Sequence, residues 1–304
     1  MSDEPLQLSL ITRRLVSSSA EIMDTPPEEI TYQHTVLCQT CLPYRNQGAQ
    51  TVWEKSQGRV ALRVEAGAAH NPDTQEWTQL GLPFGPKPRL VLMHLNAQAL
   101  RTGSATVEVE DSLTSFVKRI GLAAHGRDIR TIKDQLSRLS AATIRLAVTQ
   151  EERAFQVNTQ IVTAFDLWFP KDERQRVLWP STVRLSEEYF QSLAKHAVPL
   201  DERAIAALSH SAMALDIYVW LAQRLHRIEY GKSQFVPWKA LKDQFGWNHK
   251  RMNNFRAVFL KALWQVHSQY RGAKIGFDDR GLTLHHSPPP IKGRIATVPS
   301  LPRK

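Results

Sequence analysis

Cysteine is scarce in this sequence, with only Cys38 and Cys41 among 304 residues. One pair of thiols cannot form the disulfide framework of a secreted protein, which favours a reducing compartment. The acidic start MSDEPLQLSL lacks the basic segment of a signal peptide. Uninterrupted apolar runs of about 18 residues, which a membrane helix needs, are also absent from the sequence. We therefore expect a chain that stays inside its cell and has no membrane partner.

Sequence motifs of common catalytic sites are missing as well. The sequence has no GxSxG or HExxH motif, and no GxGxxG motif at a strand–helix junction. Gly276 and Gly281 have the spacing of a phosphate-binding loop, but Leu282 stands where that loop needs lysine. His285 and His286 are adjacent, so on a strand they point to opposite faces and cannot share a metal ion. We therefore expect a protein that is not an enzyme and needs no cofactor.

The spacing Cys38-Gln39-Thr40-Cys41 is typical of half a zinc site. With His34 it offers at most three ligands, whereas a structural zinc site has four, and the sequence has no second CxxC motif. We interpret the two cysteines as ordinary buried thiols and expect no metal ion.

Basic residues outnumber acidic residues by 39 to 29, which gives a net charge of +10. The excess is uneven, because residues 1–30 have a net charge of −4 whereas residues 224–274 have a net charge of +9. The basic block also contains core-forming aromatic residues, so we expect a folded, positively charged surface rather than a basic tail. Such a surface attracts the phosphate backbone of nucleic acid or anionic lipid. The simpler alternative is that the charge only serves solubility.

The first part of the chain contains a leader, a hairpin and a connector. Residues 1–30 combine serine, proline and acidic residues without a sustained period, which predicts a disordered acidic leader. Residues 59–64 alternate between apolar and polar side chains and, with residues 52–55, predict a β-hairpin. Residues 81–88 (GLPFGPKP) predict a stiff connector that ends where a helix begins.

After the connector, one order of elements occurs twice. The first set has helices at about 89–100, 112–120 and 127–140 with strands at 105–110, 143–148 and 154–165; the second has helices at 209–226, 238–245 and 251–270 with a hairpin at 274–285. Between the sets, residues 186–195 predict a helix and residues 197–200 a break. A helix-turn-helix followed by a hairpin is the winged-helix arrangement. The sequence thus predicts an α+β fold of two tandem winged-helix domains, 31–170 and 171–290, with an N-terminal hairpin extension and mobile termini that include the basic tail 291–304.

The helices at 127–140 and 251–270 each keep a polar face when their apolar stripe is subtracted. Arginine and lysine can contact guanine or phosphate, asparagine suits adenine, and the major groove admits one helix. The alternative for each helix is a solvated basic face. Trp220, Trp238, Trp247 and Trp264 are interpreted as core residues, with stacking platforms as the alternative. The predicted DNA-binding residues are Arg127, Arg130, Thr131, Lys133, Arg138, Lys250, Arg251, Asn253, Asn254, Arg256 and Lys261.

Several segments resemble a known family, the plasmid-encoded RepA-type replication initiators. The segments are LPYR at 42–45, LPFGPKPRL at 82–90, SLTSFVKRIGL at 112–122, VPLD at 198–201, MALDIYVWLA at 213–222 with RLH at 224–226, and LTLHHSPPP at 282–290. Together they span about residues 42–290, which is nearly the whole predicted folded region. The acidic leader and the CxxC pair have no counterpart in the resemblance.

The resemblance implies a paired winged-helix initiator in the bacterial cytoplasm. Its partners would be double-stranded plasmid origin DNA, bound at repeated sites (iterons), and host replication proteins such as the replicative helicase, its loader or the host initiator. Related initiators also switch between a monomer and a homodimer. Two alternatives remain open from the residues: a winged-helix transcription repressor without an origin role, and a rolling-circle nicking enzyme.

Overall fold

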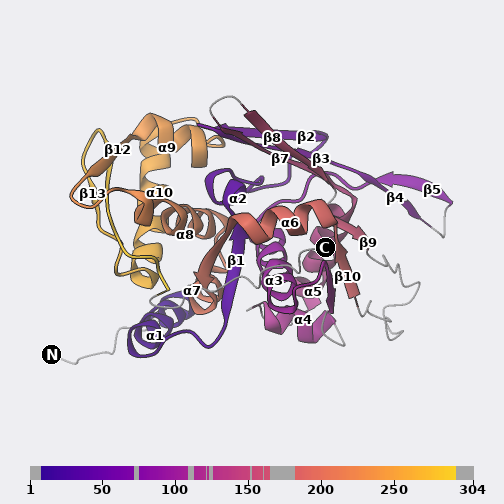
Figure 1. Ribbon diagram of the computed structural model, residues 1–304, viewed down its shortest axis with the longest axis horizontal. Coiled ribbons are helices and arrows are strands. Elements are labelled where there is room, and N and C mark those ends of the chain that lie inside the picture. The colour runs from indigo at the N-terminus through magenta and orange to yellow at the C-terminus, as the bar shows by residue number, and fades with distance from the viewer. Residues whose placement is uncertain are drawn as a thin grey trace.

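The computed structural model describes residues 8–71, 75–108, 113–120, 122, 126–150, 153–159, 161–164 and 182–291, and it has a mixed α/β fold (Figure 1). The elements up to residue 164 are α1 (Leu10–Asp24), β1 (Ile30–His34), α2 (Thr35–Gln39), β2 (Val52–Gln57), β3 (Val60–Glu65), β4 (Ala68–Asn71), β5 (Glu76–Gln79), α3 (Pro86–Thr102), β6 (Thr106–Glu108), α4 (Leu113–Arg119), α5 (Gly126–Ala141), β7 (Thr143–Gln150), β8 (Arg153–Thr159) and β9 (Val162–Ala164). The later elements are β10 (Thr182–Leu185), α6 (Glu187–His196), β11 (Ala197–Asp201), α7 (Glu202–Leu208), α8 (Ala212–Arg224), a 3-10 turn (Leu225–Arg227), β12 (Ser233–Pro237), α9 (Trp238–Phe245), α10 (Met252–Gln269), β13 (Ile275–Phe277) and β14 (Gly281–His285).

The prediction of a disordered leader is wrong for residues 10–24, which form α1. The Ser9 hydroxyl accepts a hydrogen bond from the Thr12 backbone N–H and so caps the helix start. The helix then docks on the late part of the chain, where Gln269 donates to the Leu15 carbonyl at 2.9 Å and Ser18 donates to the Arg203 carbonyl at 3.1 Å. Its ordering therefore depends on partners far away in the sequence, which local composition does not reveal. Residues 1–7 lie outside the described residues.

The predicted hairpin is confirmed as β2 and β3, but it is not an extension. Strand β3 pairs antiparallel with β7 from Val60↔Val148 to Glu65↔Thr143, which gives a four-stranded sheet in the order β2-β3-β7-β8. Strand β6 pairs with β10 rather than with β7 or β8. A winged-helix unit would place β6 in one sheet with the β7–β8 hairpin. The first half departs from this prediction, because β6 and the β7–β8 hairpin lie in different sheets.

The second half contains helices α8, α9 and α10 with a three-stranded sheet in the order β12-β14-β13. Strand β12 pairs with β14 from Ser233↔His285 to Pro237↔Gly281. The break predicted at residues 197–200 is a strand instead: β11 pairs with β1 from Ile30↔Asp201 to His34↔Ala197. Pro199 is tolerated there because this sheet has two strands, so each strand has one unpaired edge. In the predicted tail, Ile291 is buried and residues 292–304 lie outside the described residues.

Helix α8 forms the centre of the molecule, and every residue from Ala212 to Gln223 is buried. It is buried on all sides because α2, α3, α7, α10 and β11 contact it. Figure 1 shows α8 and β1 between the elements α9–α10 on the left and α3–α5 on the right. The predicted domain boundary at residue 170 lies outside the described residues. Around it the halves share elements, since β10 pairs with β6 whereas β1 pairs with β11.

Side-chain contacts join the halves at several places, among them a buried ion pair and an aromatic cluster. Arg89 on α3 and Asp216 on α8 form a buried bidentate ion pair, with Nε–Oδ1 and Nη2–Oδ2 distances of 2.7 and 2.8 Å. Arg89 also donates to the carbonyls of Leu42 at 2.7 Å and Gly85 at 2.6 Å. A guanidinium is suited to this position because its fixed fork of donors can satisfy several acceptors at once.

The second junction is aromatic and lies at the turn between α9 and α10. The ring centroids of Trp53 on β2 and Trp247 are 4.5 Å apart, and the Lys55 ammonium lies 5.1 Å from the centroid of Trp53. The hairpin of the first half therefore supports the turn between α9 and α10.

Candidate nucleic-acid interface

The turn between α9 and α10 is shaped by a close helix–helix contact. Helix α9 ends at Gly246, where a Cβ atom would collide with the ring of Phe255 on α10. Phe255 is fully buried, and its ring centroid lies 5.4 Å from that of Phe259. Aromatic residues on the inner stripe of α10 thus fix the angle between the two helices, and they leave the opposite face of α10 directed outward.

The outward face of α10 carries most of the residues predicted in the second half. Lys250, Arg251, Asn253, Asn254 and Lys261 are all exposed. Arg251 occupies the N-cap position with extended backbone, and its side chain makes no capping hydrogen bond. The positive end of the helix dipole and two adjacent basic side chains make this end of α10 favourable for an anion such as phosphate.

Arg256 is the exception on this face, because two neighbours hold its side chain. Its guanidinium lies 5.0 Å from the ring centroid of Trp238, and its Nη2 is 3.0 Å from Oδ1 of Asp279. The Arg256 side chain is 28% exposed, whereas that of Asp279 is fully exposed. Asp279 lies in the β13–β14 turn, and the sequence does not indicate its role because an acidic turn residue gives no signal for DNA binding.

The β13–β14 turn is anchored to the start of α9. Trp238 donates from its indole N–H to the Asp278 carbonyl at 2.9 Å and from its backbone N–H to the Arg280 carbonyl at 3.0 Å. The Asp278 carboxylate accepts hydrogen bonds from the backbone N–H groups of Arg280 at 2.8 Å and Gly281 at 3.0 Å. These bonds stabilise the charged carboxylate and lower the pKa of Asp278. The turn therefore has a fixed position next to α10.

Helix α5, the predicted reader of the first half, presents a smaller open face. Its predicted apolar stripe is confirmed by the buried side chains of Ile132, Leu136 and Leu139. Arg130 is exposed, Thr131 and Lys133 are half-buried, and the side chain of Arg127 lies outside the described residues.

The predicted contact Arg138 has structural partners within the protein. Its Nε lies 2.9 Å from Asp134, its Nη1 donates to the Leu82 carbonyl at 3.4 Å, and its guanidinium lies 5.3 Å from the ring centroid of Phe84. Gln135 beside it is buried and accepts a hydrogen bond from the Phe84 backbone N–H at 2.7 Å. This part of α5 therefore holds the connector that precedes α3.

The two helices lie on opposite sides of the α8–β1 centre, with α10 on the left and α5 on the right of Figure 1. Residues 82–240 match the profile of a family described as plasmid-encoded RepA protein, which is more than half of the 304-residue chain. The chain belongs to this family. The resemblance drawn from the sequence is thus confirmed, and membership supports a plasmid replication initiator role.

Solved structures of RctB domains 2–3 resemble this RepA-family chain in fold. One crystal structure, RctB-155-483, has a TM-score of 0.50 at 10% sequence identity and covers 82% of this chain and 94% of that chain. A second, of selenomethionine derivatives of domains 2 and 3, has a TM-score of 0.52 at 10% identity and covers 83% and 98%. No match was found among curated proteins.

Two segments that carry the RepA resemblance meet inside the protein. Arg89 follows LPFGPKP at 82–88, and Asp216 lies in MALDIYVWLA at 213–222. Their ion pair is nearly inaccessible, with side-chain exposures of 3% and 6%. These residues therefore position the halves of the RepA-family chain relative to each other and do not face a ligand.

The remaining candidates are structural. Cys38 and Cys41 are buried free thiols, and burial raises the pKa of both well above its usual value, so both stay protonated and poorly reactive. Among the described residues, no group of three or more His, Cys, Asp or Glu side chains could hold a metal ion. No helix in the described part of the chain is long and apolar enough to cross a membrane.

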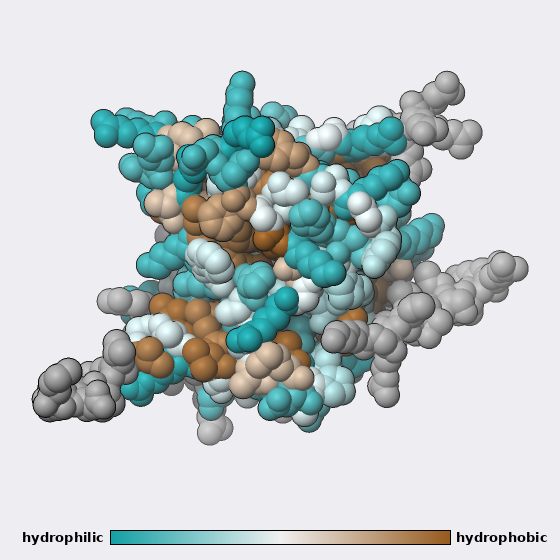
Figure 2. All heavy atoms as spheres, turned by 90° about the vertical axis from the view of Figure 1, so that its left-hand side faces the viewer, coloured by the Kyte–Doolittle hydropathy of each residue, from teal (hydrophilic) through white to brown (hydrophobic). Residues whose placement is uncertain are grey.

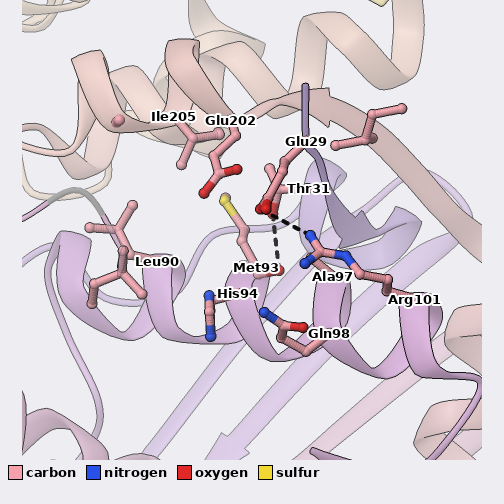
Figure 3. A pocket seen from close by; sticks show the side chains of 13 residues that line it. Glu29, Thr31, Leu90, Met93, His94, Ala97, Gln98, Arg101, Glu202 and Ile205 are labelled. Atoms are coloured by element: carbon pink, nitrogen blue, oxygen red, sulfur yellow. Dashed lines mark hydrogen bonds and ion pairs between the residues drawn. The ribbon is translucent and has the colours of Figure 1, made fainter. Parts of the chain in front are cut away.

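One cavity lies between α3, β1 and α7 (Figure 3). Arg101 bridges its mouth by an ion pair of 3.0 Å to Glu29, and Thr31 donates to the Met93 carbonyl at 3.0 Å. Its volume of about 40 Å³ suits a water molecule, whereas small-molecule sites measure roughly 300–1,000 Å³.

The interpretation of Trp264 as a core residue is wrong, since it is 60% exposed on the outward face of α10. It lies eleven positions after Asn253, which is close to three helical turns, so the two residues share one side of the helix. Its ring centroid is 6.2 Å from that of Phe277, which is also exposed. Figure 2 shows apolar surface among hydrophilic groups on this side of the molecule.

Proposed function

We propose that this RepA-family chain is a plasmid replication initiator that binds repeated origin sites through two winged helices. The order α8-β12-α9-α10 followed by the hairpin β13–β14, with the sheet order β12-β14-β13, supports the winged-helix assignment of the second half. In the first half, α3-β6-α4-α5 followed by β7–β8 has the same order of elements and supports a second, modified unit.

The observation that carries the proposal is the exposed face of α10. Arg251 and Lys250 reach phosphate or guanine, whereas Asn253 and Asn254 have the donor and acceptor needed for adenine. An exposed arginine at the N-cap position, a helix N-terminus and a neighbouring hairpin together form the surface of a major-groove reader. In α5 the corresponding basic residues are Arg130 and Lys133, and the sequence predicts Arg127 as a third.

The origin role follows from family membership together with this surface. A protein that bends or tightly holds its sites can help to open neighbouring AT-rich DNA, since bending costs about 1–6 kcal/mol that binding must supply. Opening then uses binding energy and host proteins, namely the replicative helicase, its loader or the host initiator. The same proposal assigns the chain to the bacterial cytoplasm, without enzymatic activity and with a homodimer as a second state.

The test is a binding measurement on duplex DNA from the cognate origin. Fluorescence anisotropy at several salt concentrations should show tighter binding to the origin repeats than to a shuffled duplex, with a strong salt dependence. Arg251→Ala and Asn254→Ala should lower affinity for the repeats, each by about 1–3 kcal/mol, without lowering the melting temperature. Arg13→Ala is the matched control because Arg13 is an exposed arginine on α1. Equal affinity for repeats and shuffled DNA would refute the proposal.

Two further assays separate the alternatives. An origin-only plasmid should replicate when the protein is supplied in trans, whereas a repressor without an origin role would not support replication. Supercoiled origin DNA incubated with the protein and Mg²⁺ should remain supercoiled, whereas a nicking enzyme would relax it and stay covalently attached.

A further inference from the structure

We propose that Asp279 is a specificity-determining residue that restrains Arg256 and so lowers binding to DNA of the wrong sequence. The inference rests on the proposed function and extends it from the residues that attract DNA to one that selects against it. It assigns a role to the acidic turn between β13 and β14, which the helix-turn-helix argument leaves unexplained.

The geometry places Arg256 at the edge of the reading face. Arg256 follows Asn253 by three residues, so the two side chains are neighbours on the surface of α10. The guanidinium of Arg256 lies 5.0 Å from the ring centroid of Trp238, and its Nη2 is 3.0 Å from Oδ1 of Asp279. A guanidinium held in this way can rotate toward a phosphate only if it leaves the carboxylate.

The charge distribution supplies the selective effect. Residues 224–274 have a net charge of +9, which attracts any duplex regardless of its sequence. Asp279 places a fully exposed carboxylate beside this surface, in a turn that Trp238 and Asp278 hold in position. On unspecific DNA, which is held by phosphate contacts alone, the carboxylate repels the backbone and keeps Arg256 occupied. On the correct site, base contacts from α10 fix a docked position in which Arg256 stays paired with Asp279, so the carboxylate lowers affinity less there than on unspecific DNA.

The test compares Asp279→Asn with wild-type protein on the origin repeats and on a shuffled duplex. The substitution keeps the size of the side chain and removes its charge. We expect affinity for the shuffled duplex to rise about threefold to tenfold, as for one unit charge at an exposed site. Affinity for the repeats should rise less, and the slope of log K against log salt on the shuffled duplex should steepen by about one, since Arg256 gains a phosphate contact.

Glu229→Gln is the matched control. Glu229 is an exposed acid in the same half and pairs with Lys232 at 2.6 Å, so its substitution also removes one negative charge and releases one cation. An equal rise for Glu229→Gln, or an equal rise on both DNAs for Asp279→Asn, would show a net-charge effect and overturn the inference. The double variant Arg256→Gln with Asp279→Asn should lose the steeper slope, and a retained slope would also overturn it.

The same experiment separates this inference from the proposed function. Wild-type protein that does not prefer repeats over shuffled DNA contradicts the proposed function, whereas the role of Asp279 is decided by the change on the shuffled duplex. Wild-type protein that binds neither DNA at low salt overturns both.

Discussion

His34 illustrates how burial defines the role of a single side chain. It is the N-cap of α2, where its Nδ1 accepts a hydrogen bond from the Val36 N–H at 3.2 Å. The proton of the neutral ring is therefore on Nε2, which lies 3.0 Å from the Ser192 hydroxyl. Burial, with a smaller effect of nearby His196, lowers the pKa of His34 from 6.5 to about 3. The residue suggested as a third zinc ligand thus serves as a neutral helix cap.

This pKa predicts a pH dependence of stability. Between pH 6.5 and about 3, the unfolded chain binds a proton at His34 and the folded chain does not, so stability falls as pH falls through this range. At pH 5 the loss from this residue should be about 2 kcal/mol relative to pH 7.5. Urea denaturation at both pH values would measure it. His34→Asn keeps a capping side chain and should reduce the pH dependence by that amount; an unchanged dependence would contradict the assignment.

At the scale of elements, the contact between α9 and α10 can be tested as a pair. Phe255→Ala should lower the free energy of unfolding by about 3–5 kcal/mol, because the ring is fully buried. Gly246→Ala should cost about 1–3 kcal/mol, because the new Cβ collides with that ring. The double variant should cost less than the sum of the two, since removal of Phe255 removes the collision. Additive losses in chemical denaturation would show that the two residues do not contact each other.

The elements with a local signal were predicted correctly from the sequence. The periodic apolar stripes of α5 and α10, the alternation in β3 and the glycine that ends α9 all lie within a short window, and the structure has these elements at nearly the predicted residues. The docking of α1, the β1–β11 pairing and the β3–β7 pairing depend on residues far away in the sequence. No local period indicates them, so the leader and the hairpin extension were predicted wrongly.

The residues of the candidate site were likewise predictable from the sequence only where the signal is local. Exposure of Lys250, Arg251, Asn253, Asn254 and Lys261 follows from the period of one helix. The partners of Arg138 and Arg256 lie on other elements, at Phe84 and at Asp279, so helical period alone cannot distinguish these held arginines from exposed ones. Whether each predicted residue contacts DNA remains a prediction for the binding measurements.

At the scale of the whole molecule, the Arg89–Asp216 pair should make a large contribution to the integrity of the fold. Asp216→Asn leaves the Arg89 charge buried without its counter-ion, which should cost about 3–5 kcal/mol of unfolding free energy. Arg89→Leu should cost a similar amount, because the carbonyls of Leu42 and Gly85 also lose their donor. A double-mutant cycle in chemical denaturation would measure the coupling, and additive losses would contradict a direct pair.

The contacts that join the halves also predict the spacing between the two positions that the protein contacts on DNA. The β1–β11 pairing, the Arg89–Asp216 pair and the contact of Trp53 with Trp247 join the halves directly, so we expect α5 and α10 to move as one body. A rigid body can hold two readers only at one separation, and one helical turn of DNA is about 34 Å.

Insertion of five or of ten base pairs at the middle of a repeat should therefore both reduce affinity to that of a single reader. The loss should be roughly 10²–10⁴-fold, which is the advantage that tethering gives to a second contact. Anisotropy titrations at one salt concentration would measure it, and the combined variant Arg251→Ala with Asn254→Ala should be insensitive to either insertion because it retains one reader. Full affinity after a ten-base-pair insertion would mean that the two halves move independently, despite the contacts that join them.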